Sequence, residues 1–220
     1  ISEWLSYNFS GNKIPYVPYI VEISKIKNNL KKKLNITKKQ IVIGCHGGSS
    51  SFDLKFVKDA LLEIVKLRKD IIFLFLNIEK FANHNRIIFL KGTTNINKKK
   101  LFLNTCDVMI YARSQGESFG LACAEFAVMN KKIISYKFNR HRAHLDHLNY
   151  QNIIEYTSKQ SLMNILKNIK KEKNIKIKDN KYLKYNSNFV MKIFKKVFLN
   201  NKTDLNLSFS DYIKNYIAHI

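Results

Sequence analysis

The sequence predicts an α/β domain of Rossmann-like architecture: a doubly wound parallel sheet of about six strands, followed by extra C-terminal helices. Short apolar runs alternate with helical patterns from residue 41 onward. The central runs are almost entirely apolar, as in strands that are covered on both faces. Short connections between runs and helices favour parallel strands joined by helical crossovers.

Six apolar runs account for the predicted strands. They cover residues 41–45, 71–76, 86–90, 107–111, 132–136 and 152–156. The first two are rich in β-branched and aromatic residues, which suit a pleated, buried surface. Ligands of such sheets bind beyond the carboxyl ends of the strands. The loops that follow these runs are therefore where we expect a site.

Helical spacing of apolar residues predicts the elements between and after the strands. Phe52, Phe56, Ala60 and Ile64 recur at helical spacing, and the other predicted helices are residues 98–104, 119–129, 162–169 and 188–198. The last two carry one apolar face each. Residues 25–39 are rich in Lys and have a helical tendency, so we expect a surface connector there.

The composition limits the classes of protein that fit. The net charge is +23, but it comes mostly from Lys that is spread along the chain together with many Asn and Ile. All three residues have AT-rich codons, so base composition of the genome explains the charge better than a nucleic-acid surface does. An anionic partner would still gain from such a field. No apolar run is long enough to span a bilayer.

The three cysteines are widely spaced and lie in apolar stretches. We expect Cys45, Cys106 and Cys123 to be small buried side chains rather than a disulfide framework or a zinc site. Free buried thiols fit a reducing compartment. We therefore expect a cytoplasmic location, and peripheral association with a membrane surface stays open.

The loop after the fourth predicted strand has the features of an anion-binding site. Residues 112–118 enter the next helix, and Ser118 is predicted to be its N-cap. The first-turn amides of Phe119, Gly120 and Leu121 then have no intrahelical acceptor, and the helix dipole adds to their attraction for an anion. Gly120 would let a phosphate approach the backbone closely.

Two carboxylates accompany this helix start. Glu117 stands just before the helix, and Glu125 lies about two turns into it among Ala, Cys and Phe. A buried carboxylate needs a partner, and a pair of sugar or ribose hydroxyls would serve. The residues alone leave a second interpretation open, in which Ser118 simply caps the helix and Glu125 lies on a solvated edge.

The segment from Glu117 to Glu125, Glu-Ser-Phe-Gly-Leu-Ala-Cys-Ala-Glu, resembles the Glu-x7-Glu motif of group 1 (GT4-like) glycosyltransferases of GT-B fold. In that family the motif runs Glu-Gly-Phe-Gly-Leu, three variable residues, Glu. The order of elements over residues 15–170 is also similar. The resemblance implies that the chain is the C-terminal, donor-binding half of a GT-B enzyme.

The resemblance divides the chain into three parts. Residues 1–38 would be the end of an N-terminal domain and the connector, residues 39–172 the nucleotide-sugar-binding domain, and residues 173–220 a C-terminal helical extension. Because the chain starts at Ile1 rather than Met, we expect a fragment without its acceptor domain. The acceptor, which the sequence does not identify, would be a glycan, a lipid or a protein.

The family's roles transfer to this chain residue by residue. The resemblance implies that Glu125 holds the ribose hydroxyls of the donor and that Glu117 contacts the transferred sugar near its anomeric centre. The backbone of Phe119, Gly120 and Leu121, next to Ser118, would face the diphosphate. The family generally retains anomeric configuration and uses no bound metal or cofactor, because amides and cations stabilise the leaving diphosphate.

The loop after the first strand departs from the family pattern Gly-Arg-x4-Lys-Gly-Phe-Asp. Residues 44–53 read Gly-Cys-His-Gly-Gly-Ser-Ser-Ser-Phe-Asp, so Cys45 and Ser50 replace the two cations. We expect His46 and the backbone of Gly47 and Gly48, with the hydroxyls of residues 49–51, to cradle a phosphate instead. Arg113 would supply the missing charge as a catalytic residue; otherwise catalysis would be weak or lost.

Other interpretations stay open. A non-catalytic domain of the same architecture would bind nucleic acid or an anionic membrane through its basic surface. Gly47-Gly48 is a fragment of a dinucleotide fingerprint, so a nicotinamide enzyme also survives. His141, His144 and His147 are spaced by three residues and suggest a metal site. For these histidines we favour a loop and an exposed helix start.

Overall fold

The computed structural model describes residues 6, 15–24, 26–148, 152–172 and 180–199. Six parallel strands form one sheet in the order β3-β2-β1-β4-β6-β8. Their bounds are β1 Ile41–His46, β2 Ile71–Leu76, β3 Ile87–Leu90, β4 Val108–Tyr111, β6 Ile133–Tyr136 and β8 Ile153–Tyr156. This confirms the six predicted strands and the Rossmann-like class.

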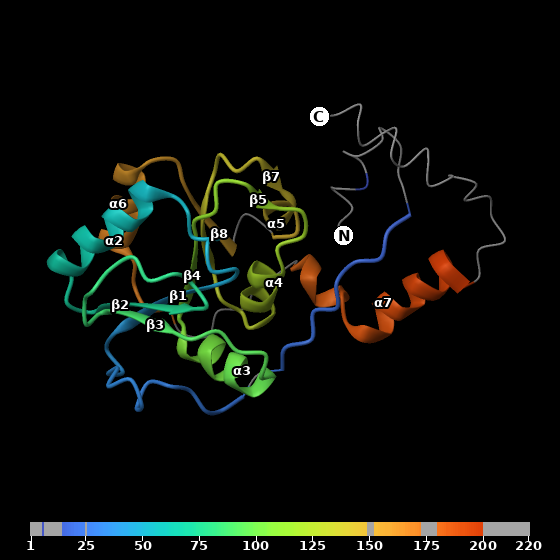
Figure 1. Cartoon of the computed structure of the whole chain (residues 1–220), viewed down its shortest axis with the longest axis horizontal. Helices are drawn as coiled ribbons and strands as arrows, with labels where there is room; N and C mark the ends of the chain where they lie inside the picture. Colours follow the sequence, from blue (N-terminus) through green and yellow to red (C-terminus); the bar gives the residue numbers. More distant parts are fainter. Residues whose placement is uncertain (1–5, 7–14, 25, 149–151, 173–179, 200–220) are drawn as a thin grey trace.

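Helices cover both faces of the sheet (Figure 1). On one face α2 (Lys55–Leu67) and α6 (Lys159–Asn168) pack together over the strands. On the other face lie α3 (Ile96–Thr105) and α4 (Leu121–Val128), which meet the sheet in a second apolar cluster. Side chains alternate between the two clusters along each strand, as the pleat requires: Val42 belongs to one and Ile43 to the other.

Polar contacts fix both ends of α6. Ser158 and Ser161 form a capping box at its start. At its end Arg68, which follows α2, donates from one guanidinium nitrogen to the carbonyls of Leu166 at 3.0 Å and Ile169 at 2.9 Å. These bonds satisfy carbonyls that a helix end otherwise leaves without a partner. The predicted helix at residues 162–169 is thereby confirmed.

The segment before β1 runs along α3 rather than away from the domain. Asn104 of α3 donates to the carbonyls of Ile26 and Asn28, both at 2.8 Å, and the amide of Leu30 donates to Thr105 Oγ1 at 2.8 Å. Residues 31–35 form turns. The helical tendency predicted for residues 25–39 is wrong for the described residues, because these contacts with α3 hold the segment in another conformation.

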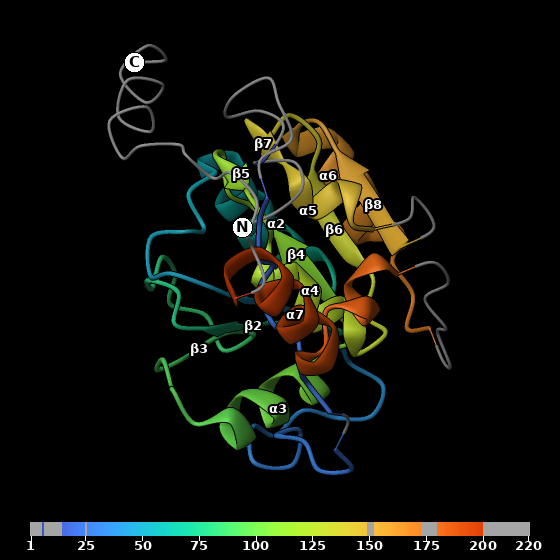
Figure 2. The same ribbon diagram turned by 90° about the vertical axis from the view of Figure 1, so that its right-hand side faces the viewer.

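The remaining C-terminal elements lie beside α4. They are the 3₁₀ turn η2 (Lys181–Lys184), the helix α7 (Ser187–Phe194) and the π-helical turn η3 (Lys195–Leu199). Figures 1 and 2 place α7 at the end of the molecule opposite α2. Residues 1–5, 7–14, 173–179 and 200–220 lie outside the described residues. The three-part division of the chain stays a prediction.

A small second sheet was not predicted. The strands β5 (Gly116–Glu117) and β7 (His141–Arg142) pair in parallel and join the loops that follow β4 and β6. Gly116 makes this pairing possible, because it has a φ of +70° and a Cβ there would lie 1.9 Å from the carbonyl oxygen of His141. Pairs of two residues carry no periodic signal that a sequence pattern could reveal.

The histidines after β7 are buried, so the prediction of an exposed helix start is wrong. In α5 (Ala143–Asp146) His144 has no exposed surface, and its Nε2 lies 3.3 Å from Ser135 Oγ. His147 packs against Tyr182 and makes contacts at both ring nitrogens, with the carbonyl of Ala143 and the hydroxyl of Tyr185. Tyr182 of η2 and Tyr185, which follows η2, pack against His147, while Tyr111 packs against His144. The local sequence does not indicate these contacts.

The cysteine prediction is confirmed, since all three thiols are free and buried. Burial raises the pKa of Cys45 to about 12, so this thiol is inert near neutral pH. Across the described residues, no helix is both long and apolar enough to cross a membrane.

The burial of His144 predicts acid sensitivity. Burial, with Arg142 and His147 nearby, lowers the pKa of His144 to about 3, whereas an unfolded His titrates near about 6.5. Below pH ~6.5 the unfolded chain therefore binds a proton that the folded chain does not, and this residue alone lowers the unfolding free energy by about 1.4 kcal/mol per pH unit. The unfolding free energy, measured with urea between pH 7 and 5, should fall less steeply with decreasing pH in His144→Gln than in the wild type. Equal slopes in the two proteins would contradict the lowered pKa of His144.

Candidate functional site

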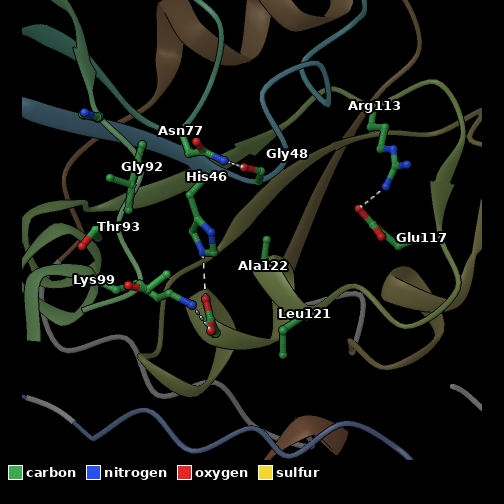
Figure 3. Close-up of a pocket in the computed structure, with 15 residues that line it drawn as sticks. His46, Gly48, Asn77, Gly92, Thr93, Lys99, Arg113, Glu117, Leu121 and Ala122 are labelled. Carbon is green, nitrogen blue, oxygen red and sulfur yellow. Dashed lines mark hydrogen bonds and ion pairs between the residues drawn. The ribbon is translucent and has the colours of Figure 1, made fainter. Parts of the chain in front are cut away.

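A cavity of about 850 Å³ opens at the carboxyl edge of the sheet. It lies at the point where β1 has β2 on one side and β4 on the other, which is where the strand order reverses. Figure 3 shows its lining. The lining residues are His46, Gly47, Gly48, Leu76, Asn77, Lys91, Gly92, Thr93, Thr94, Lys99, Arg113, Glu117, Leu121, Ala122 and Glu125.

The structure brings together most of the residues that the sequence singled out. Seven of the predicted site residues line the cavity, and three do not. The seven are His46, Gly47, Gly48, Arg113, Glu117, Leu121 and Glu125; the three are Ser118, Phe119 and Gly120. The site is therefore assembled by the loops after β1 and β4 and by the start of α4.

The predicted N-cap of α4 is wrong. The helix begins at Leu121, and Gly120 is its N-cap with a left-handed backbone, φ +82° and ψ +56°. No side chain caps this end, so Ser118 does not have that role. The first-turn amides without intrahelical acceptors then start at Leu121 and Ala122, which both line the cavity. The helix start still faces the cavity, two residues later than expected.

Phe119 and Gly120 build the helix start rather than the wall of the cavity. Phe119 is only 2% exposed and packs among aromatic rings, and its carbonyl accepts the hydroxyl of Tyr182 at 2.6 Å. A Cβ on Gly120 would lie 2.5 Å from the Cβ of His144. Because Gly120 has no Cβ, α5 approaches the backbone closely at this position, whereas the sequence predicted that a phosphate would do so.

Glu125 is held by one contact on each carboxylate oxygen. It is 5% exposed, so the interpretation as a solvated edge is wrong. Lys99 Nζ lies 2.9 Å from Oε1, and His46 Nε2 lies 3.0 Å from Oε2. Burial raises the pKa of Glu125, but the contacts with His46 and Lys99 lower it by more, so that it lies below its ordinary value. Glu125 is therefore ionised at neutral pH.

The ring of His46 is itself fixed by packing. It stacks on Phe126 of α4 with centroids 5.8 Å apart, and it meets the edge of Phe102 of α3 at 5.9 Å. In Figure 3 His46 points toward this carboxylate from above and Lys99 points toward it from the left. Apart from the 3.0 Å contact, neither His46 Nε2 nor Glu125 Oε2 has another hydrogen-bond partner within the described part of the chain.

Glu117 is held in a different way. The hydroxyl of Tyr111 donates to its Oε1 at 3.2 Å, and the guanidinium of Arg113 donates to the same oxygen at 3.0 Å. Burial lowers the pKa of Arg113, but Glu117 raises it by more. The other oxygen, Oε2, has no hydrogen bond to any described residue. Glu117 therefore keeps one oxygen free beside a cation (Figure 3).

The loop after β1 is tied to its neighbours by backbone and side-chain contacts. Asn77, which follows β2, donates from Nδ2 to the carbonyl of Gly47 at 2.8 Å. Ser51 Oγ donates to the carbonyl of Gly48 at 2.7 Å. Cys45 is buried under α2 and therefore offers nothing to the cavity, while Ser50 is exposed and does not line it. The two positions where the family has cations thus carry none here.

Sequence reasoning missed the cations that do reach the cavity beside Arg113. Lys99 comes from α3, and Lys91 directly follows β3. Lys99 lies within a run of three lysines at residues 98–100, so no local signal distinguishes it from its neighbours. Only the fold shows which of the three faces Glu125. Tyr111 is the last residue of an apolar strand, so the sequence did not indicate that its hydroxyl contacts Glu117.

No cluster of His, Cys, Asp and Glu in the described segments has an arrangement that could hold a metal ion. The metal interpretation of His141, His144 and His147 has no support there, because the last two make the contacts described above. The expectation that the chemistry needs no metal or cofactor stays a prediction.

Comparison with known proteins establishes the fold. No protein-family model and no curated protein sequence matches the chain. Among solved structures, Alr3699/HepE from Anabaena in complex with UDP and glucose has a TM-score of 0.62 at 17% identity, over 84% of this chain and 55% of that one. The chain thus spans about half the length of that neighbour.

Two further neighbours agree with this. The C-terminal domain of a group 1 family glycosyl transferase (LpcC) from Francisella tularensis has a TM-score of 0.50 at 14% identity, over 80% of this chain and 96% of that domain. A glycosyltransferase from Rickettsia africae has a TM-score of 0.50 at 15% identity, over 77% and 51%. The chain has the Rossmann-like fold of GT-B glycosyltransferases, including group 1 members, as the sequence resemblance predicted.

Gly120 at the start of α4 and Gly48 in the cavity lining should respond differently to the same substitution. Gly120→Ala places a Cβ at positive φ and against His144, so it should lower the unfolding free energy by about 3 kcal/mol. Gly48→Ala meets no atom within 4 Å and should change it by less than about 0.5 kcal/mol. Urea unfolding measures both. Equal stabilities for the two variants would show that the helix start does not depend on the left-handed residue.

Proposed function

We propose that the chain is the donor-binding domain of a glycosyltransferase, which moves a sugar from a nucleotide diphosphate sugar to an acceptor. One observation carries the proposal. At the switch point of the sheet, a single cavity holds two ionisable carboxylates, Glu117 and Glu125, together with the start of α4 and three cations. The fold shared with glycosyltransferases supports it, and so does a neighbour of the same fold that was crystallised with UDP and glucose.

The contacts suggest how the donor is bound. Glu125 would accept the ribose hydroxyls, because it lines the cavity and its carboxylate is ionised beside Lys99. The amides that begin α4 at Leu121, with the Gly47-Gly48 backbone, would face the diphosphate. Lys91 has no ion-pair partner among the described residues and would add positive charge on that side.

Glu117 and Arg113 are the residues we propose for the transfer step. Glu117 Oε2 would contact the sugar, and the Arg113 guanidinium, fixed by Oε1, would stabilise charge that develops on the leaving diphosphate. The bond between the anomeric carbon and the diphosphate oxygen breaks, a bond from that carbon to the acceptor oxygen forms, and the proton of the acceptor hydroxyl passes to the departing diphosphate oxygen. We further propose that transfer retains configuration and needs no metal or cofactor, as the resemblance implies.

The partners are proposals of the same kind. The acceptor would be a glycan, a lipid or a protein, and the site would be completed by further protein that closes over the cavity. Free buried thiols support a cytoplasmic location. Association with an anionic membrane surface is compatible with the net charge of +23.

A thermal-shift screen of UDP-, GDP-, ADP- and dTDP-sugars tests the proposal. A nucleotide sugar at about 100 times its dissociation constant should add about 2.7 kcal/mol to the unfolding free energy. Glu125→Gln, which keeps the shape of the side chain but removes its charge, should abolish the shift. The matched control is Glu63→Gln, an exposed carboxylate of α2 that pairs with Lys159.

Binding of polyanions to the same protein, measured as a function of salt, tests the second candidate function, a module that binds nucleic acid or an anionic membrane. Binding to any polyanion that weakens steeply with salt, without a shift by any nucleotide sugar, would contradict donor binding. It would instead support a module that binds nucleic acid or an anionic membrane.

A further inference from the structure

The loop after β6 is fixed beside the segment that carries Arg113. The amide of Arg140 donates to the carbonyl of Ser114 at 3.3 Å. Asn139, which is 6% exposed, donates from Nδ2 to the carbonyl of Arg113 at 2.7 Å. Residues 137–140, which we call the β6 rim, therefore have a set position relative to the Arg113 side of the cavity.

Two side chains of the β6 rim point away from the protein. Asn139 is turned inward, and its neighbours Phe138 and Arg140 are exposed, Phe138 to 62%. Phe138 meets the ring of Tyr136 edge to face, with centroids 5.8 Å apart. The backbone beneath is held as well, because the amide of Lys137 donates to the end of β8 at 2.9 Å. A loop that a rigid scaffold holds with its side chains exposed is the common setting of a binding surface.

Arg140 differs from the other arginines of the chain. The chain has five Arg, and four of them make side-chain contacts with described residues: Arg68, Arg86, Arg113 and Arg142. Within the described ranges, neither the guanidinium of Arg140 nor the ammonium of Lys137 has a partner. The carboxylates of neighbouring elements, Asp53 and Glu155, already have partners. Two cations without a counter-charge favour an anionic ligand at the β6 rim.

The β6 rim borders the end of the cavity where transfer would occur. In Figure 3 Arg113 and Glu117 lie on the right of the cavity, and Gly92 and Thr93 lie on the left. The rim is bonded to the Arg113 segment and so lies at the Arg113 end. An acceptor hydroxyl must come within about 3.5 Å of the anomeric carbon. An acceptor that reaches the sugar near Glu117 would therefore lie next to the β6 rim.

The chemistry of the β6 rim favours a phosphorylated sugar over a membrane surface. A phosphate monoester carries a charge of about −1.5 to −2 at pH 7, and a guanidinium binds two of its oxygens at once. The ring of Phe138 offers a flat apolar surface to one face of a sugar, and the exposed amide of Gln115 can bond its hydroxyls. A membrane needs a wider apolar face. Over residues 112–118 and 137–142, Phe138 is the one large apolar side chain that is exposed.

We propose that the β6 rim is an acceptor subsite, in which Arg140 and Lys137 bind the phosphate group of a phosphorylated sugar and Phe138 packs against its ring. The inference rests on the proposed function and deepens it, because it names the class of acceptor. The rim lies outside the residues that line the cavity. Donor and acceptor should therefore bind at the same time.

An NMR titration of the nucleotide-saturated protein tests the proposal. Calorimetry first identifies which of UDP, GDP, ADP and dTDP binds most tightly, and that nucleotide then fills the cavity so that a phosphate probe cannot bind there. The probes are glucose 6-phosphate, glucose and inorganic phosphate at constant ionic strength. Backbone amide shifts of residues 137–140 report binding at the rim. Sedimentation with vesicles of anionic phospholipid tests the membrane separately.

Three variants separate the contacts. Arg140→Gln removes the guanidinium, and Phe138→Ala removes the ring. The matched control is Lys66→Gln, which changes the net charge by the same amount as Arg140→Gln. Lys66 is exposed in the last turn of α2, which runs from the loop after β1 to the start of β2, so it lies at the opposite edge of the sheet. Circular dichroism checks that the variants are folded.

We expect glucose 6-phosphate, but not glucose, to shift residues 137–140 in a saturable way. Arg140→Gln should weaken both glucose 6-phosphate and inorganic phosphate by about tenfold, as the loss of a charge-assisted, two-pronged contact predicts. Phe138→Ala should weaken glucose 6-phosphate by about threefold and leave inorganic phosphate unchanged, because only the sugar meets the ring. Lys66→Gln should match the wild type, and every variant should bind the nucleotide within about twofold.

Three results would overturn the proposal and leave donor binding standing. The first is the absence of a saturable shift at residues 137–140 with glucose 6-phosphate. The second is equal weakening by Arg140→Gln and Lys66→Gln, which would show that only net charge matters. The third is sedimentation of the wild type, but not of Arg140→Gln, with anionic vesicles while glucose 6-phosphate does not bind. If the wild type binds none of the four nucleotides, the proposed function itself fails, and the acceptor subsite fails with it.

Discussion

The ion pair of Glu125 with Lys99 and its contact with His46 tie the site together. A carboxylate that is 5% exposed on an apolar helix is tolerable only with partners, and here they come from two other elements. The contact therefore joins the end of β1, the middle of α3 and the second turn of α4 around one atom group. If the Glu125 carboxylate moved, the end of β1 and α3 would both lose the contact that holds them at a fixed position relative to α4.

The sheet places these elements beside one another. Because all six strands are parallel, their carboxyl ends share one edge, and the reversal of order between β1 and β4 leaves a gap between the crossovers on the two faces. The start of α4 opens into that gap. Gly120 in a left-handed conformation and Gly116 in the β5–β7 pairing set the path between β4 and α4. Backbone geometry thus determines where Glu117 and Glu125 can lie.

Periodicity and apolar runs were sufficient to predict the sheet, its helices and the loops that carry the site. Glu117 and Glu125 could be selected through the Glu-x7-Glu resemblance at the start of a buried helix, and His46 and Arg113 as replacements for the cations that the loop after β1 lacks. Two kinds of feature could not be predicted. Lys99 is one of three consecutive lysines, and only the packing of α3 against α4 chooses it. The helix start at Leu121 depends on the approach of α5 to Gly120, a contact between residues 24 positions apart.

The central claim is that the cavity between β1 and β4 binds a nucleotide sugar. Backbone amide chemical shifts, recorded with and without UDP-glucose, test it most directly because they locate the ligand without a substitution. The account predicts that the largest shifts fall in residues 46–48, in residues 91–94 and at the start of α4. Shifts confined to the basic surface of α6 or α7, with none at those positions, would contradict it.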